Sequence, residues 1–484
     1  MKMLPPILFL ALLLGCNQEP VVNPEPPVTP DGPVATVYTT SVAGKRFDES
    51  TILLGKPEDV HFYKVERSGE TFQEVDGFGL AITQASCWNL LLMPEADRTA
   101  FLTELFSREN GLGSSLIRVC IGGSDFSLDE FTWCDEPGME NFAVHPLDQE
   151  WLFPVLDQIF RINPAVKIIA SPWSCPRWMK MSESGGSYDA WTGGRLNPAH
   201  YQDYADYFVR WIQEMEKRGY PIYAVTLQNE PLNRGNSMSL YMPWEDQRDF
   251  IKQAVGPAFR AAGIKAKILL FDHNYNYDDI ASQRDYPLHI LADADAAQYV
   301  AGSAWHNYGG KVSTLDKIHS SYPDKEIFFT EASIGTWNYS FDGCLINDFR
   351  DIFLGTLGRF GKGVTLWNLM LDDERKPFRP GGCSTCFGAV TLSTSDHKSL
   401  TRNSHYYNVA HCSKVLAPGA VRQGTKGYET AGLTYQWYRN PDGSQALLLL
   451  NEGSTDALVN FVTDKHTLAC KVPAKAIQSI RWEE

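Results

Sequence analysis

Residues 222–231 of the chain read IYAVTLQNEP, an apolar and β-branched run that ends abruptly in polar residues, with Glu230 among them. A run of this kind is typical of a strand that is buried on both faces of a parallel sheet. A carboxylate directly after such a strand is costly unless it has partners or a chemical role. Residues 326–331, which read EIFFTE, repeat the pattern with Glu331 at the end. These two stretches indicate a buried parallel sheet with acidic side chains at one edge.

Short apolar runs of the same type recur along the chain and alternate with helical patterns, which favours repeated βα units. The eight expected strands are Val75–Thr83, Ser115–Gly122, Val166–Ser171, Ile222–Gln228, Lys267–Phe271, Ala301–His306, Glu326–Thr330 and Gly363–Asn368. The clearest helical patterns between them are Pro94–Phe106, Pro198–Lys217, Glu245–Ala262 and Cys344–Phe360. Eight βα units close naturally into a (β/α)8 TIM barrel, so we assign residues 73–414 to an α/β barrel.

The two flanks of this barrel have a different pattern, with strand-like alternation and turn signals but no long helices. They are residues 34–72 and 415–484. In the second flank, the turn NPDG at residues 440–443 separates two apolar runs and predicts a hairpin. We expect the flanks to form one antiparallel β-sandwich domain beside the barrel, built from both ends of the chain.

The first segment, residues 1–15, predicts a signal peptide. Lys2 precedes a mostly apolar run over residues 4–14, which is about half the ~20 residues that a membrane-spanning helix needs. Small residues before Cys16 resemble the lipobox of bacterial lipoproteins, in which the cysteine is lipidated; an ordinary secretory signal is the alternative. Residues 16–33 are rich in proline and predict an extended linker. We therefore expect an exported lipoprotein of the outer membrane or cell surface, attached to the membrane only through this lipid.

The composition is that of an ordinary globular protein, with 43% hydrophobic and 21% charged residues. The formal net charge of −15 would repel nucleic acid and anionic lipid, so we expect no nucleic-acid partner. Of the 10 cysteines, an odd number remains if Cys16 is lipidated, so at least one stays unpaired or pairs outside the chain. Cys383 and Cys386 are the closest pair and Cys120 and Cys134 flank one loop, but spacing alone assigns no partners.

Polar side chains follow most of the expected strands, and in a barrel of this kind the carboxyl ends of the strands carry the chemistry. Glu230 and Glu331, after the fourth and seventh strands, can face each other across the barrel mouth. Two facing carboxylates, one protonated and one ionised, are the groups that hydrolyse glycosidic bonds. A separation of about 5–5.5 Å gives retention of configuration and about 6.5–9.5 Å gives inversion. The sequence therefore predicts a glycoside hydrolase without fixing this distance.

Together these segments resemble glycoside hydrolase family 30, which includes lysosomal glucosylceramidase and microbial β-1,6-glucanases. The matching motifs are Asp76-Gly77-Phe78-Gly79, Arg118 with Asp125-Phe126-Ser127, Ser171-Pro172-Trp173-Ser174-Cys175-Pro176-Arg177-Trp178-Met179-Lys180, Gln228-Asn229-Glu230-Pro231, His306-x-Tyr308, Thr330-Glu331 and Trp367-Asn368-Leu369. The resemblance covers about residues 35–484, and the motifs are specific jointly rather than singly. It implies a TIM barrel with a side β-sandwich, and a retaining mechanism.

The resemblance also implies roles for individual residues. Glu230 matches the acid/base of the family and Glu331 its nucleophile. The substrate-binding residues that it implies are Asp125, Trp173, Asn229, Tyr308 and Trp367. Asn229 would hydrogen-bond the 2-hydroxyl of the sugar at the cleaved bond. Arg118 would lie beside the nucleophile and keep it ionised, while His306 either supports this network or is a buried structural histidine.

The sequence departs from glucosylceramidase after the eighth strand. Residues 372–377 and the Gly-Cys-x-x-Cys segment at 382–386 look more like the microbial members. We therefore favour a β-glucan substrate with 1,6 linkages; glucosylceramide and small aryl or alkyl β-glucosides are the alternatives.

Two other classes of function were weighed against the hydrolase. One is a non-catalytic carbohydrate-binding lipoprotein that kept the barrel, and the presence of both carboxylates disfavours it. The other is a metal hydrolase with ligands from Asp272-His273 and Asp278-Asp279. The chain has no His-x-His pair and a single CxxC motif, so neither this site nor a zinc site is favoured. We expect no metal and no cofactor.

Overall fold

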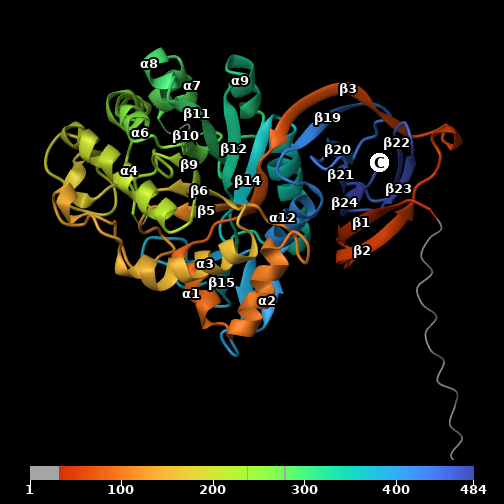
Figure 1. The fold of residues 1–484 in the computed structure, drawn as a ribbon, viewed down its shortest axis with the longest axis horizontal. Coiled ribbons are helices and arrows are strands. Elements are labelled where there is room, and N and C mark those ends of the chain that lie inside the picture. Colours follow the sequence, from red (N-terminus) through yellow and green to blue (C-terminus); the bar gives the residue numbers. More distant parts are fainter. Residues whose placement is uncertain (1–31, 237, 277–279) are drawn as a thin grey trace, which may run out of the picture.

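The computed structural model describes residues 32–236, 238–276 and 280–484, which form two adjoining bodies (Figure 1). The predicted signal peptide, Cys16 and nearly all of the proline-rich linker lie outside the described residues. None of the helices in the described ranges combines the length and the apolar character needed to cross a membrane.

The larger body is the predicted TIM barrel. Its eight strands are β4 (Gly77–Leu80), β5 (Leu116–Cys120), β6 (Lys167–Ser171), β9 (Ile222–Thr226), β10 (Lys267–Asn274), β11 (Val300–His306), β12 (Glu326–Glu331) and β14 (Gly361–Leu366). They follow the order β4-β14-β12-β11-β10-β9-β6-β5, and every hydrogen-bonded pair is parallel. A parallel bridge between Ala81 and Arg118 and a bond of 2.8 Å from the Ile82 amide to the Arg118 carbonyl join β4 to β5 and close the barrel.

The barrel is filled by side chains, as a TIM barrel of this size must be. One layer of its interior consists of the fully buried residues Leu116, Ile169, Ala224, Leu269, Ala304 and Phe328, one from each of six strands. The residues of this layer lie near the start or the middle of their strands. The polar residues further along the strands are therefore confined to the carboxyl-terminal mouth.

Helices surround the barrel and supply the outer half of its core. Their bounds are α1 (Gln84–Leu92), α2 (Glu95–Phe106), α3 (Phe153–Ile162), α4 (Tyr201–Lys217), α5 (Trp244–Phe250), α6 (Gly256–Ala262), α7 (Tyr286–Leu291), α8 (Ala294–Ala297), α9 (Thr314–Ser321), α10 (Phe341–Asp348), α11 (Gly355–Leu357) and α12 (Ser404–Val415). The predicted helix 245–262 is formed by α5 and α6 with a π-helical turn, Ile251–Val255, between them. A second π-helical turn, Phe349–Leu354, joins α10 to α11.

The smaller body is the predicted sandwich built from both ends of the chain. Its strands are β1 (Val34–Ser41), β2 (Arg46–Leu53), β3 (Lys64–Val75), β19 (Ala420–Gly427), β20 (Leu433–Arg439), β21 (Gln445–Asn451), β22 (Ala457–Val462), β23 (Thr467–Val472) and β24 (Ala476–Trp482). In Figure 1 the red N-terminal strands lie among the blue C-terminal ones. The predicted hairpin at residues 440–443 is confirmed, because it joins the antiparallel strands β20 and β21.

One strand pair corrects the expectation of a wholly antiparallel sandwich. The sheet order is β2-β1-β24-β21-β20-β19-β3-β22-β23, and β3 pairs with β22 in parallel. β3 thus lies between β19, to which it is antiparallel, and β22, to which it is parallel. Reciprocal bonds of 2.8 Å between Gly55 and Thr467 bring the two ends of the sheet together around a core that contains Trp437 and Phe461.

Short ribbons decorate the carboxyl-terminal mouth of the barrel. They are β7 (Lys180–Met181) with β8 (Arg195–Leu196), β13 (Ile334–Gly335) with β16 (Cys386–Phe387), and β15 (Met370–Asp372) with β17 (Val390–Leu392) and β18 (Leu400–Arg402). Cys383 and Cys386, the closest pair in the sequence, form a disulfide beside β16. Cys120 and Cys134 are not bonded to each other and are both free thiols.

Candidate active site

Glu230 lies just past the end of β9, where the backbone turns sharply. Its φ of 45° is in the left-handed region, which is unfavourable for a residue with a side chain. Two backbone hydrogen bonds hold this turn: the Glu230 amide donates to the Asp272 carbonyl at 3.0 Å, and the Asn229 amide donates to the Pro172 carbonyl at 2.8 Å. Neighbouring strands therefore fix the direction of the acidic side chain, which is buried.

Glu331 is the last residue of β12, and its two carboxylate oxygens have different partners. Arg118 Nη1 donates to Oε2 at 2.5 Å, and the Tyr308 hydroxyl donates to Oε1 at 3.0 Å. The same arginine donates from Nη2 to Asn229 Oδ1 at 2.8 Å. One buried guanidinium thus connects Glu331 to the residue that precedes Glu230, so the two carboxylates belong to one connected site.

A third buried carboxylate, Asp272, is hydrogen-bonded to several of the residues around this site. It is contacted by Arg118 Nη2 at 2.8 Å, Ser171 Oγ at 2.6 Å, Thr226 Oγ1 at 2.7 Å, Thr330 Oγ1 at 2.6 Å and His306 Nε2 at 3.0 Å. Burial alone would raise the pKa of Asp272, but the Arg118 charge and the hydrogen bond to His306 hold this pKa well below its usual range. From the sequence, Asp272 was considered only as a metal ligand, so its place in this hydrogen-bond network was missed.

His306, for which the sequence left both a supporting role and a structural role open, lies between Asp272 and Glu230. The ring is fully buried, and its Nδ1 is 3.5 Å from Glu230 Oε1. Burial alone would lower the pKa of His306, but the Glu331 charge and the hydrogen bond to Asp272 raise the pKa to about 9. A second histidine, His273, has Nδ1 at 3.8 Å from Glu230 Oε1, and burial lowers its pKa to about 4. One imidazolium and one neutral imidazole therefore flank Glu230.

These charges set the protonation of the two glutamates. Burial alone would raise the pKa of Glu230, but the hydrogen bond with His306 and the charges of both histidines lower the pKa to about 2. Burial raises the pKa of Glu331 despite the opposing charges of His306 and Arg118, and the charge of Glu230 adds to this increase. In the free site the exchangeable proton therefore resides on the His306 side of the Glu230–His306 pair.

Three of the predicted sugar-binding residues, Asp125, Trp173 and Trp367, lie beside this site. The rings of Trp173 and Trp367 stack with centroids 4.9 Å apart, and the guanidinium of Arg118 lies 4.9 Å from the Trp173 centroid. Asp125 Oδ1 and Trp173 Nε1 are buried without a hydrogen-bond partner among the described residues. Burial, with the charges of Glu331 and Glu230, raises the pKa of Asp125 well above its usual range. Polar atoms of this kind at an aromatic wall suit the hydroxyl groups of a sugar.

Three groups at the site have the donor types of a metal centre. The potential ligand atoms of Glu230, His273 and His306 lie within 4.8 Å of one another. The Nδ1 atoms of His306 and His273 lie 3.5 Å and 3.8 Å from Glu230 Oε1. Asp278 and Asp279, the other residues of the weighed metal site, lie outside the described residues.

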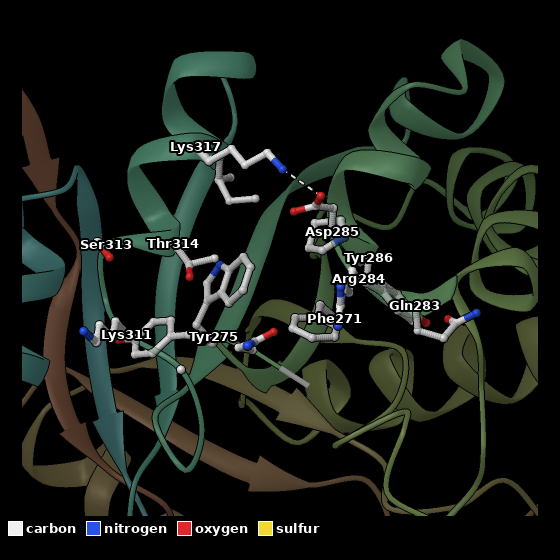
Figure 2. A pocket seen from close by; sticks show the side chains of 15 residues that line it. Phe271, Tyr275, Gln283, Arg284, Asp285, Tyr286, Lys311, Ser313, Thr314 and Lys317 are labelled. Carbon is white, nitrogen blue, oxygen red and sulfur yellow. Dashed lines mark hydrogen bonds and ion pairs between the residues drawn. The ribbon is translucent and has the colours of Figure 1, made fainter. Parts of the chain in front are cut away.

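The protein also has a separate cavity of about 590 Å³, between α7 and α9 (Figure 2). Phe271 and Trp305 contribute to its wall, and each is followed by a catalytic-site residue, Asp272 or His306, whose side chain points to the other face of the strand. Lys317 and Asp285 form an ion pair of 2.7 Å across its rim. The cavity therefore lies behind the barrel wall and shares no lining residue with the carboxylate pair.

Family comparisons agree with this architecture. The description "Glycosyl hydrolase family 30 TIM-barrel domain" matches residues 75–416, and "Glycosyl hydrolase family 30 beta sandwich domain" matches residues 419–480. Together the two matches cover the barrel and the C-terminal part of the sandwich.

Individual relatives fall into two groups by name. The endo-1,6-beta-D-glucanase BGN16.3 of Trichoderma harzianum is 32% identical over 414 residues, which is 81% of this chain and 80% of the relative. The putative glucosylceramidase 2 of Caenorhabditis elegans is 30% identical over 436 residues, 86% of this chain and 82% of the relative. Among solved structures, the endo-beta1,6-glucanase BT3312 is 49% identical, has a TM-score of 0.90, and aligns with 94% of this chain and 100% of its own.

Proposed function

Since the chain belongs to glycoside hydrolase family 30, we propose that it is a retaining hydrolase that cleaves β-1,6-glucan at internal bonds. The observation that carries the substrate is the 49% identity, over nearly the whole chain, to a solved endo-beta1,6-glucanase. The chemistry is supported by the hydrogen bonds of Arg118, which link Glu331 to Asn229, the neighbour of Glu230. Relatives named as glucosylceramidases are less similar, at 26–30% identity.

In the first step Glu331 attacks the anomeric carbon, the bond to the leaving oxygen breaks, and a glycosyl–enzyme ester forms. Arg118 and Tyr308 hold the attacking carboxylate and restrict its rotation. Asn229, fixed by the same arginine, is placed to bond the 2-hydroxyl, a contact that strengthens in the transition state. Asp125, Trp173 and Trp367 enclose the rest of this sugar.

The leaving oxygen takes its proton from the Glu230–His306 pair. Glu230 Oε1 faces His306 Nδ1, and Asn233 Nδ2 donates to Glu230 Oε2 at 2.8 Å, which leaves the carboxylate oriented between them. Because the free pair holds its proton on His306, Glu230 delivers a proton that His306 supplies. In the second step Glu230 accepts a proton from water, and the water oxygen displaces Glu331 from the anomeric carbon.

The charge on His306 predicts the pH dependence of kcat/KM. Activity needs an ionised Glu331, so it falls as the pH drops through the raised pKa of this group. It also needs the proton on the Glu230–His306 pair, so it falls again as the pH rises through about 9. His306→Gln removes a cation that lowers the pKa of Glu331, so the acidic limb should move to higher pH. It also removes the group that titrates near 9, so the alkaline limb should move to lower pH.

The measurement is kcat/KM of wild type and His306→Gln on one aryl β-glucoside from pH 3.5 to 10. A narrower bell for the variant supports the proton pair. Superimposable profiles would show that His306 has only a structural role. His405→Gln is a matched control, because this buried histidine contacts Asp348 at 3.1 Å rather than the carboxylate pair, and its profile should match that of wild type.

The substrate is tested by product analysis on purified polymers. We expect β-1,6-glucan to be cut into a series of short 1,6-linked oligosaccharides early in the reaction, which is the pattern of internal cleavage. Glucans with 1,3 or 1,4 linkages and glucosylceramide should be turned over at least about tenfold more slowly, a difference of the size that subsite contacts produce. Faster hydrolysis of glucosylceramide than of β-1,6-glucan would overturn the substrate assignment.

We also propose that the protein is exported and anchored at the bacterial surface through a lipid on Cys16. The support is the sequence pattern alone: a basic residue, a short apolar run over residues 4–14, and small residues before Cys16. Metabolic labelling with a fatty acid should mark the wild-type protein and not Cys16→Ser. Equal labelling of the two would contradict the anchor.

A further inference from the structure

Two large aromatic side chains are exposed at the mouth of the barrel. Trp337 is 55% exposed and Tyr308 is 45% exposed. The Tyr308 hydroxyl touches both Glu331 Oε1 and, at 2.9 Å, Ser333 Oγ. Ser333 begins the segment that leads through β13 to Trp337. The Tyr308 hydroxyl therefore links the nucleophile to the segment that carries Trp337.

The position of Trp337 is set by the ribbon beneath it. A Cβ atom on Gly335 would lie 1.9 Å from Cζ3 of Trp337, so the indole rests directly on a backbone that only glycine leaves open. β13 pairs with β16, and the Thr336 amide donates to the Thr385 carbonyl at 2.9 Å. One side of the indole is therefore supported by the ribbon, and more than half of its surface faces solvent.

The same ribbon forms part of the wall of the sugar site. Cys386, in β16, packs in one cluster with Trp173 and Trp367, and Cys383 packs against this cluster. The segment that leads to Cys383 also lies against Asp125: the Arg379 amide donates to the Asp125 carbonyl at 2.7 Å, and a Cβ on Gly382 would be 2.9 Å from the Asp125 Cβ. The β13–β16 ribbon therefore contacts the two tryptophans of the sugar site through Cys386, and the chain that follows β13 presents Trp337 to solvent.

A hollow of about 380 Å³ beside Trp337 offers polar partners. Its lining includes the hydroxyls of Ser333 and Ser340 and the amides of Asn338 and Asn347. An aromatic face with hydroxyl and amide groups around it is the composition of a small-ligand site. Sugars present one apolar C–H face and a rim of hydroxyls, so this composition suits a hexose.

We propose that the indole of Trp337 stacks against the glucosyl unit on the leaving-group side of the cleaved bond. The hydroxyls of this sugar would enter the hollow beside Trp337, which Ser333 and Asn338 line. This inference rests on the proposed retaining mechanism. The sugar that is attacked occupies the buried end of the cleft, at Asp125 and Trp173. The sugar on the other side of the bond must lie toward the exposed end, where Tyr308 and Trp337 are. Trp337 then favours a polysaccharide leaving group over a small one.

The test uses the covalent intermediate, because a sugar acceptor reaches it only through the leaving-group site. Enzyme is first trapped with a 2-deoxy-2-fluoroglucosyl donor, and reactivation is followed against the concentration of gentiobiose, the β-1,6-linked glucose disaccharide. Trp337→Ala should raise the half-saturating gentiobiose concentration by about tenfold, while Trp337→Phe, which keeps an aromatic face, should change it by less than about threefold. Phe62→Ala replaces an exposed aromatic residue that is distant from Trp337 in the sequence, so this variant should match wild type.

A second substrate separates this role from a loss of folding or of the buried site. β-Gentiobiosyl fluoride has no sugar in its leaving group, so Trp337→Ala should hydrolyse it at close to the wild-type rate. Equal losses on the fluoride and in gentiobiose reactivation would overturn the proposal, and so would unchanged reactivation. If wild type is not trapped at all, the retaining mechanism fails. If cellobiose reactivates the wild-type enzyme better than gentiobiose does, the proposed preference for 1,6 linkages is wrong. The comparison of wild type with Trp337→Ala is then made with cellobiose as the acceptor.

Discussion

Glu331→Gln is expected to lower kcat by about 10⁵-fold, the scale of loss seen when an enzyme loses its nucleophile. The amide cannot form the glycosyl ester, although its carbonyl oxygen can still accept a hydrogen bond from Arg118 and its NH₂ group can face the Tyr308 oxygen. The fold should therefore persist. The measurement is kcat on an aryl β-glucoside and on β-1,6-glucan, together with the melting temperature.

The chain offers a control for this variant on the same strand. Glu326 begins β12 and forms ion pairs with Lys267 at 2.7 Å and Lys362 at 3.1 Å, away from the barrel mouth. Glu326→Gln should keep wild-type kcat. A fluorosugar that forms a covalent adduct should label Glu331 in wild type, as peptide mass spectrometry can show. If another residue is labelled, that residue is the nucleophile and Glu331 is not. If no residue is labelled, a non-catalytic sugar-binding protein is favoured.

Glu230→Ala is expected to lower kcat/KM on β-1,6-glucan by about 10²–10⁴-fold, the usual contribution of general acid catalysis. A dinitrophenyl β-glucoside needs little proton assistance to leave, so its glycosylation step should slow far less. The second step then lacks its base, and the glycosyl–enzyme should accumulate. Added azide needs no base, so it should restore turnover and yield a β-glucosyl azide.

The readouts are the two kcat/KM values, a pre-steady-state burst of dinitrophenolate, and the azide product. Glu245→Ala serves as a control, because this glutamate lies in the first turn of α5 and contacts Gln283 at 2.9 Å. It should behave as wild type. Equal losses on both substrates, with no response to azide, would remove Glu230 from the role of acid/base.

Much of this site could be predicted because the signal was local. Glu230 and Glu331 each follow a short apolar strand, and parallel strands bring their carboxyl ends to the same mouth of a barrel. Position on a strand indicated these two glutamates. The place of Arg118 beside the nucleophile was implied by the family resemblance, and the structure has both Arg118 and Tyr308 within hydrogen-bond distance of Glu331.

Asp272 shows where sequence reasoning stopped. It also follows an apolar run, so the same signal was present, but β10 continues to Asn274 and the side chain turns into the barrel. Its partners Ser171, Thr226 and Thr330 come from three other strands. No local pattern predicts that these hydroxyls converge on one carboxylate, because the register between strands decides it. The exposed position of Trp337 depends in the same way on the pairing of β13 with a distant ribbon.

The pairing of the first strand with the last limits when the molecule can finish folding during its synthesis. Val37 in β1 lies opposite Ile480 in β24, so a nascent chain must present one edge of β1, which is otherwise paired only with β2, until β24 has been synthesised. Unpaired strand edges of this kind invite association with other chains. Premature termination before β24 should therefore yield a protein that aggregates even though every strand of the barrel has already been made.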